Sequence, residues 1–193
     1  MALPMLPRVI IIPGNHETPI EVNWYLSVKR ELEAKGFHVI ANTMPDGYVA
    51  SKEVWLPYIE EQLQNNPNSI LIGHSSGAVA ALRYAETHQV EGIIMVGACY
   101  TDLDDELERK SGYYSTPWQW DKIKKNAKWI VQFASIDDPF IPIAEPRHIQ
   151  QQLAAEYHEY EDEGHFGTSF KAKNEFPEIV FTVLKKARLP LPL

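Results

Sequence analysis

Residues 69–81 of the chain read SILIGHSSGAVAA, and this stretch decides the fold. The apolar run before Gly73 is typical of a buried β-strand, and the small residues after Gly77 are typical of a helix. A Gly-x-Ser-x-Gly sequence between a strand and a helix predicts a sharp turn that presents the hydroxyl of Ser75 at the top of a sheet. The crowded turn leaves almost no room for a side chain two positions before and after the serine. Ser75 would also lie at a helix N-terminus, which stabilises developing negative charge.

Strands and helices alternate on both sides of this stretch. Apolar runs predict strands at residues 9–12, 37–41, 70–72, 92–97 and 129–134, with a weaker edge-like strand at 158–161. Helices are expected over residues 22–32, 51–63, 76–88, 120–125, 146–154 and 177–187, and residues 98–119 are expected to form an irregular insert. Because the connections are too long for hairpins, the pattern predicts a mostly parallel six-stranded sheet in a three-layer α/β/α sandwich. No linker or repeat divides the chain, so residues 1–193 are expected to form a single domain.

Composition and charge exclude several classes of function. The net charge of −8 and the lack of a basic cluster argue against a nucleic-acid partner. Neither Gly-x-Gly-x-x-Gly nor a Walker loop is present, which argues against a nucleotide site. Cys99 is the one cysteine, so no internal disulfide can form. With no signal peptide and no membrane-spanning run in the sequence, we expect a cytoplasmic protein without a membrane partner.

A nucleophilic serine requires a base and a group that orients the base. On this kind of sheet the expected chain order is serine, acid, histidine. His165 lies in a glycine-flanked loop between the last strand and the last helix, whereas the alternative, His158, lies inside that strand. Asp137 and Asp138 both follow the fifth strand, and either carboxylate could face the histidine. We expect His165 to take the proton of Ser75 as the hydroxyl attacks an acyl carbon.

The oxyanion that forms in such a reaction needs two backbone N–H donors. One is expected from Ser76, the residue after the nucleophile, and the other from the loop after the first strand, where Asn15 and His16 are the candidates. The alternative for Asn15 and His16 is a plain loop role. His74 is expected to pack under the turn, because its backbone cannot bring it to the serine hydroxyl.

Aromatic residues gather in the insert, on the side of the sheet where Ser75 is expected. Tyr113, Trp118 and Trp120 are candidates for the wall of an apolar substrate pocket, with core packing as the alternative for each. The acidic run at residues 102–108 contains no histidine and no repeated ligand spacing, so it predicts a solvated face and no metal site. Cys99 is expected to be a buried apolar residue and not a nucleophile.

With these motifs in this order, the sequence resembles the α/β-hydrolase superfamily and, more narrowly, the retinoblastoma-binding protein 9 and YdeN-like serine hydrolase family. The resemblance implies a Ser75, Asp138, His165 triad, small ester or amide substrates, aminoacyl ones among them, and no cofactor. In hydrolases of this type the acid usually begins an Asp-Pro-x-x-Pro run, which favours Asp138 over Asp137. The stretches that carry the resemblance are VIIIPGN (9–15), MPD (44–46), WLP (55–57), IGHSSGA (72–78), RYAETH (83–88), SGY (111–113), PWQW (117–120), DDPF (137–140) and GHF (164–166).

The chain departs from that family in two places. The family's Leu-x-Cys-x-Glu segment, on which retinoblastoma-protein binding rests, is replaced by LQNNP at residues 63–67, so such a partner is not expected. The glycine-rich loop after the first strand is replaced by HETP at residues 16–19, so the family's pattern does not identify the second oxyanion donor in this chain. Two alternatives to hydrolysis stay open: a protein-binding module on a hydrolase fold with weak or vestigial activity, and an acyltransferase that uses the same residues.

Overall fold

The computed structural model describes residues 5–167 and 171–189, and within these ranges six strands form one sheet in the order β2-β1-β3-β4-β5-β6. Every neighbouring pair is parallel, which confirms the predicted sheet. The strands are β1 (Arg8–Ile12), β2 (His38–Ala41), β3 (Ser69–His74), β4 (Gly92–Val96), β5 (Ile130–Ser135) and β6 (Glu156–Tyr160).

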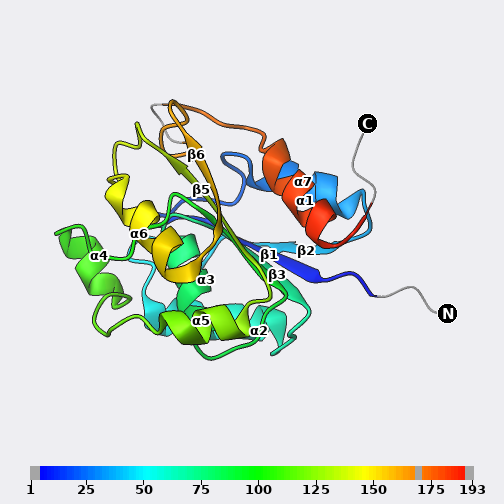
Figure 1. The fold of residues 1–193 in the computed structure, drawn as a ribbon, viewed down its shortest axis with the longest axis horizontal. Helices are drawn as coiled ribbons and strands as arrows, with labels where there is room; N and C mark the ends of the chain where they lie inside the picture. Colours follow the sequence, from blue (N-terminus) through cyan, green and yellow to red (C-terminus); the bar gives the residue numbers. More distant parts are fainter. Residues whose placement is uncertain (1–4, 168–170, 190–193) are drawn as a thin grey trace.

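Helices cover both faces of this sheet, as the connection lengths predict (Figure 1). One face is covered by α1 (Tyr25–Glu33) and α7 (Pro177–Lys186), which contact each other. The opposite face carries a layer whose members contact one another in sequence order: α2 (Lys52–Leu63), α3 (Ser76–Ala85), α5 (Trp120–Asn126) and α6 (Ala144–Leu153). The three-layer arrangement is therefore confirmed. Among the described residues, no helix is both long enough and apolar enough to cross a membrane.

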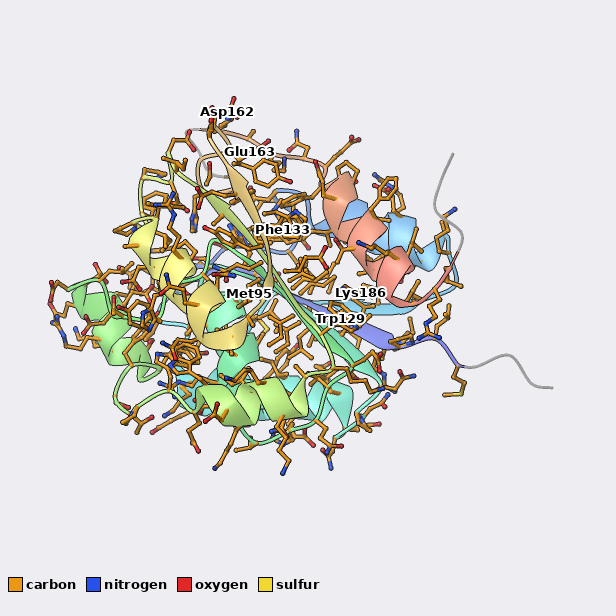
Figure 2. All side chains as sticks on the ribbon, in the orientation of Figure 1. Met95, Trp129, Phe133, Asp162, Glu163 and Lys186 are labelled. Carbon is orange, nitrogen blue, oxygen red and sulfur yellow. The ribbon has the colours of Figure 1, made fainter. Side chains whose placement is uncertain are left out.

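Two hydrophobic cores lie on the two faces of the sheet, because successive strand side chains point in opposite directions. Ile10 of β1 belongs to the core under α2 and α3, whereas the adjacent Ile11 belongs to the core under α1 and α7. Met95 and Phe133, on the neighbouring strands β4 and β5, lie in these two cores respectively (Figure 2). Strands buried on both faces explain why the sequence shows unbroken apolar runs instead of alternation.

The structure differs from the sequence prediction in the insert and at the last strand. Residues 98–119 are not wholly irregular, because they contain the short helix α4 (Glu106–Ser111). Asp105 caps this helix by accepting hydrogen bonds from the N–H groups of Leu107 and Glu108. The acidic run predicts only a solvated face, because an N-cap aspartate among other acidic residues has no distinct sequence signal. β6 begins at Glu156, before the predicted residue 158, since polar residues on an edge strand weaken the apolar signal.

The register of the strands brings their carboxyl ends to one edge of the sheet. Ile12 pairs with Gly73, Gly73 with Met95, and Val96 with Phe133. The loops that follow β1, β3, β4 and β5 therefore begin side by side. In open α/β sheets this is the edge where ligands bind.

Candidate active site

Ser75 occupies a sharp turn between β3 and α3. Its backbone has φ 56° and ψ −123°, a conformation that costs free energy for any residue with a side chain and marks functional sites. Its N–H donates a hydrogen bond of 2.8 Å to the carbonyl of Val96, at the end of β4. A Cβ on Gly73 would collide with the backbone of Gly77 and Ala78, so the first glycine of the motif is required by packing.

A buried histidine–carboxylate pair lies on the loops after β5 and β6. The Nδ1 atom of His165 is 2.7 Å from Oδ2 of Asp138, and the two side chains are 8% and 2% exposed. The other carboxylate oxygen accepts hydrogen bonds from the N–H groups of Phe140 (2.9 Å) and Ile141 (3.0 Å). Because the carboxylate can only accept, Nδ1 of the neutral imidazole carries the proton and Nε2 keeps a lone pair. This is the tautomer that a general base requires.

The end of β4 joins the nucleophile turn to this pair. The carbonyl of Val96 accepts from Ser75, and the next residue, Gly97, packs against His165 and Asp138. A Cβ on Gly97 would lie 2.9 Å from Cε1 of His165 and 3.6 Å from Oδ2 of Asp138, so only glycine leaves room for the pair. The turn at Ser75 and the imidazole of His165 therefore both contact the end of β4.

Asp137, the alternative acid, has a different contact. Its Oδ1 accepts hydrogen bonds from the hydroxyl of Ser135 (2.6 Å) and from the N–H of Gly164 (2.7 Å). The Ser135 hydrogen bond is the main reason that the pKa of Asp137 is lowered. The structure thus pairs Asp138 with the histidine, while Asp137 fastens the loop that carries it.

Two other histidines, His158 and His74, pack against neighbouring side chains. The ring of His158, on β6, stacks on the ring of Phe133, on β5, with 4.9 Å between the ring centroids. Its Nε2 lies 3.4 Å from the Glu156 carboxylate. His74 lies under the turn, as expected, and is 3% exposed. Burial lowers the pKa of His74 to about 3, so its ring is neutral at physiological pH.

The loop after β1 also packs against Ser75. A Cβ on Gly14 would lie 3.3 Å from Cβ of Ser75. The next residue, Asn15, is buried, and its carbonyl accepts from the N–H of Thr18 at 3.2 Å. His16 is exposed, and its N–H donates to the carbonyl of Tyr48 at 3.3 Å. Which of these residues supplies an oxyanion donor stays a prediction.

A family model described as serine hydrolase matches residues 9–183 of the chain. This chain belongs to the serine hydrolase family. The Rattus norvegicus protein named serine hydrolase RBBP9 is 45% identical to it over 178 residues, covering 91% of this chain and 93% of that protein. The YdeN protein of Bacillus subtilis (strain 168) is 29% identical over 167 residues, covering 84% and 87% of the two chains.

Solved structures agree with this assignment. The crystal structure of the ydeN gene product from B. subtilis superposes on this serine hydrolase with a TM-score of 0.85 at 25% identity, covering 93% of this chain and 98% of that one. A monoacylglycerol lipase from Paleococcus ferrophilus, at 15% identity, shares the fold with a TM-score of 0.66 over 94% and 96% of the chains. The protein is therefore an enzyme with the α/β-hydrolase fold, and the family resemblance seen in the sequence is confirmed.

The sequence did not reveal the role of Glu108 in this serine hydrolase. Its Oε1 accepts a hydrogen bond of 2.7 Å from the side-chain amide of Asn15, and its Oε2 accepts one of 3.1 Å from the hydroxyl of Tyr114. Burial raises the pKa of this carboxyl. Glu108 stands in an acidic run on the insert, so nothing in the sequence distinguishes it from its solvated neighbours.

The aromatic residues of the insert are packed together. Tyr113 is fully buried, and its hydroxyl has no hydrogen-bond partner within the described ranges. Trp118 donates its indole N–H to the carbonyl of Tyr100 (2.8 Å) and stacks on Trp120 at 5.0 Å. The buried guanidinium of Arg83 lies 3.7 Å from the centre of the Trp118 ring. Contact of these rings with substrate stays a prediction of the sequence.

The acidic run does not assemble a metal site. Across residues 5–167 and 171–189, no three His, Cys, Asp or Glu side chains are grouped so that they could hold a metal ion. Asp102 and Asp104 face Arg109 instead, at 3.0 Å and 3.9 Å. Cys99 is buried, as expected, and its sulfur lies 3.0 Å from the hydroxyl of Tyr114.

Proposed function

We propose that this serine hydrolase cleaves small carboxylic esters and amides, aminoacyl derivatives among them, through a Ser75–His165–Asp138 triad. The observation that carries the proposal is the buried hydrogen bond of 2.7 Å between His165 and Asp138. This pair packs against Gly97, which directly follows Val96, the residue whose carbonyl binds the Ser75 N–H. A carboxylate held in this way fixes the imidazole in the tautomer that accepts a proton at Nε2.

In the proposed reaction, His165 takes the hydroxyl proton of Ser75 as the oxygen attacks the acyl carbon. Asp138 stabilises the imidazolium that forms, without taking the proton itself. His165 then gives the proton to the leaving alcohol or amine, and the acyl-enzyme ester on Ser75 remains. A water molecule then attacks the ester while His165 takes a proton from that water. His165 passes this proton to the Ser75 oxygen as the carboxylic acid product leaves.

The backbone N–H of Ser76 is the first proposed oxyanion donor, because Ser76 is the first residue of α3 and the helix dipole favours negative charge there. For the second donor the Asn15 N–H is favoured over that of His16. Two contacts support this choice: the His16 N–H is already directed at the Tyr48 carbonyl, and Gly14, before Asn15, packs against Ser75.

We place the acyl group of the substrate against the half-buried indoles of Trp118 and Trp120. This placement is supported by the stacking of the two rings and by the partial exposure of both side chains. We also propose a cytoplasmic location, which a lone buried cysteine without a disulfide partner favours.

A fluorophosphonate probe tests the proposed function. Intact protein is incubated with the probe, and the modified residue is identified by peptide mass spectrometry. We expect labelling on Ser75, and none in Ser75→Ala. Ser76→Ala is the matched control, because the Ser76 hydroxyl is buried without a hydrogen-bond partner in the described residues, and the substitution keeps the backbone N–H. Folded wild-type protein that stays unlabelled, or is labelled at another residue, would contradict the proposal.

A further inference from the structure

His74 precedes the nucleophile in the chain, yet its side chain contacts the histidine of the proposed triad. Its Nε2 lies 2.8 Å from the backbone carbonyl oxygen of His165, and the two imidazole rings are 4.8 Å apart between centroids. Its Nδ1 lies 2.5 Å from the hydroxyl of Tyr25, at the start of α1. The proposed chemistry uses neither His74 nor Tyr25.

The direction of these hydrogen bonds follows from the chemistry of the groups. A carbonyl oxygen only accepts, so Nε2 of His74 must carry a proton. The ring is neutral because burial keeps the pKa near 3, so it has only that one proton. Nδ1 therefore carries a lone pair, and the hydroxyl of Tyr25 must donate to it.

Tyr25 is suited to this role. It is fully buried, and burial raises its pKa to about 12, so the hydroxyl keeps its proton at physiological pH. The side-chain amide of Asn23 donates to the hydroxyl oxygen at 3.5 Å, and the backbone of Gly14 interacts with the same oxygen. The phenol is thus aimed at His74 and is tied to the loop after β1.

The adjacent residue, Trp24, makes a parallel contact. Its indole N–H donates a hydrogen bond of 2.9 Å to the carbonyl of Phe166. The start of α1 therefore binds two consecutive carbonyls of the histidine loop, His165 through His74 and Phe166 directly. This loop needs such support because Phe166, which has a side chain, is held at a positive φ of 54°.

We propose that Tyr25 and His74 are positioning residues that hold the backbone of His165 at the place from which its imidazole reaches Ser75. The proposal rests on the proposed triad. Tyr25 acts by fixing the tautomer of His74, and His74 acts by binding the His165 carbonyl. The neutral state of His74 matters as well, because a second positive charge beside His165 would oppose the imidazolium that forms during the reaction.

Tyr25→Phe is the first test. The substitution removes one buried hydroxyl that the proposed chemistry does not use. It frees His74 to place its proton on Nδ1, which turns a lone pair toward the His165 carbonyl. With p-nitrophenyl acetate as substrate, we expect kcat to fall about 10-fold and KM to change less than about two-fold, since a misplaced base affects chemistry and not binding. The low-field proton resonance of the His165–Asp138 hydrogen bond is expected to shift or broaden.

Tyr84→Phe is the matched control. Tyr84 is a buried tyrosine whose hydroxyl donates to Glu60 at 2.5 Å on the opposite face of the sheet. It should lose stability without a change in kcat or in the low-field resonance. Unchanged kcat in folded Tyr25→Phe would overturn the proposal, as would an equal loss of kcat in both variants.

If Tyr25→Phe does not fold, a pair of substitutions at His74 decides the question. Glutamine can donate to the His165 carbonyl and accept from Tyr25, whereas methionine, of similar length, cannot donate and accepts only weakly. We expect kcat of His74→Gln to exceed that of His74→Met by at least about five-fold; equal values would overturn the proposal. Fluorophosphonate labelling of wild type at a residue other than Ser75 would contradict the triad, whereas normal labelling with unchanged rates in the variants would contradict only the positioning role.

Discussion

The side-chain amide of Asn15 donates a hydrogen bond of 2.7 Å to the carboxylate of Glu108, a residue 93 positions later in the chain. This contact joins the loop after β1 to the insert after β4, and the same carboxylate also accepts from Tyr114. The side chain of Glu108 therefore joins the proposed second oxyanion donor, Asn15, to the insert.

Glu108→Ala is expected to loosen the Asn15 loop. The loss of two hydrogen bonds to a half-buried carboxylate should lower the free energy of unfolding by about 1–3 kcal/mol. We expect kcat/KM for an ester substrate to fall about 10-fold, because an oxyanion donor that is no longer held in place stabilises the transition state less. Urea unfolding and steady-state kinetics measure the two effects. Glu106→Ala, at an exposed position on the same helix, should change neither by much; equal effects would show that Glu108 has no special role.

Asp138→Asn separates the two adjacent aspartates. An amide in place of the carboxylate no longer enforces the proton on Nδ1 of His165, and kcat is expected to fall by about 10⁴, the size of the loss known for the same change in the chymotrypsin triad. Asp137→Asn should cost far less activity, because Asp137 binds Ser135 and Gly164 and not the imidazole. A larger loss in Asp137→Asn than in Asp138→Asn would reverse the assignment.

Gly97→Ala tests the space beside the triad. The new methyl group would lie 2.9 Å from Cε1 and 3.0 Å from Nδ1 of His165, at a residue with φ +57°. We expect a folded protein in which the imidazole is displaced and kcat falls about 100-fold. Gly112→Ala is the control, since Gly112 also has positive φ, +79°, but nothing lies within 4 Å of its added methyl. That variant should lose about 1 kcal/mol of stability through backbone strain and keep its activity.

His74 also makes stability depend on pH. An unfolded histidine binds a proton below a pH of about 6.5, whereas folded His74 has its pKa lowered to about 3. Between these values the unfolded state holds more protons, so stability should fall as the pH drops, with a limiting slope of about 1.4 kcal/mol per pH unit from this residue. His74→Gln removes that contribution, and urea unfolding at about pH 7 and about pH 4.5 should show a shallower decline.

The control for this measurement is His38→Gln, at an exposed position on β2. It should keep the wild-type pH dependence, because its side chain is not buried by folding. A wild-type slope that persists in His74→Gln would mean that His74 is not the buried neutral histidine described above.

Local pattern was sufficient to predict the sheet and the sharp turn at Ser75. The run at residues 69–81 shows a strand, a glycine-flanked serine and a helix in order, and each is a property of neighbouring residues. Parallel strands buried on both faces also leave a plain signal, since residues 9–12 and 92–96 have no polar side to present. The short helix α4 was missed because an N-cap aspartate inside an acidic run looks like its solvated neighbours.

The amino-acid sequence by itself determined the fold, the family and the turn that carries Ser75, because these depend on spacing within short segments. Only the tertiary structure decided which aspartate faces His165, that Glu108 holds Asn15, and that Tyr25 reaches His74. These contacts join residues on different helices, strands and loops, between 27 and 93 positions apart. Their partners are selected by sheet register and loop packing, and those follow from the whole chain folding around the turn at Ser75.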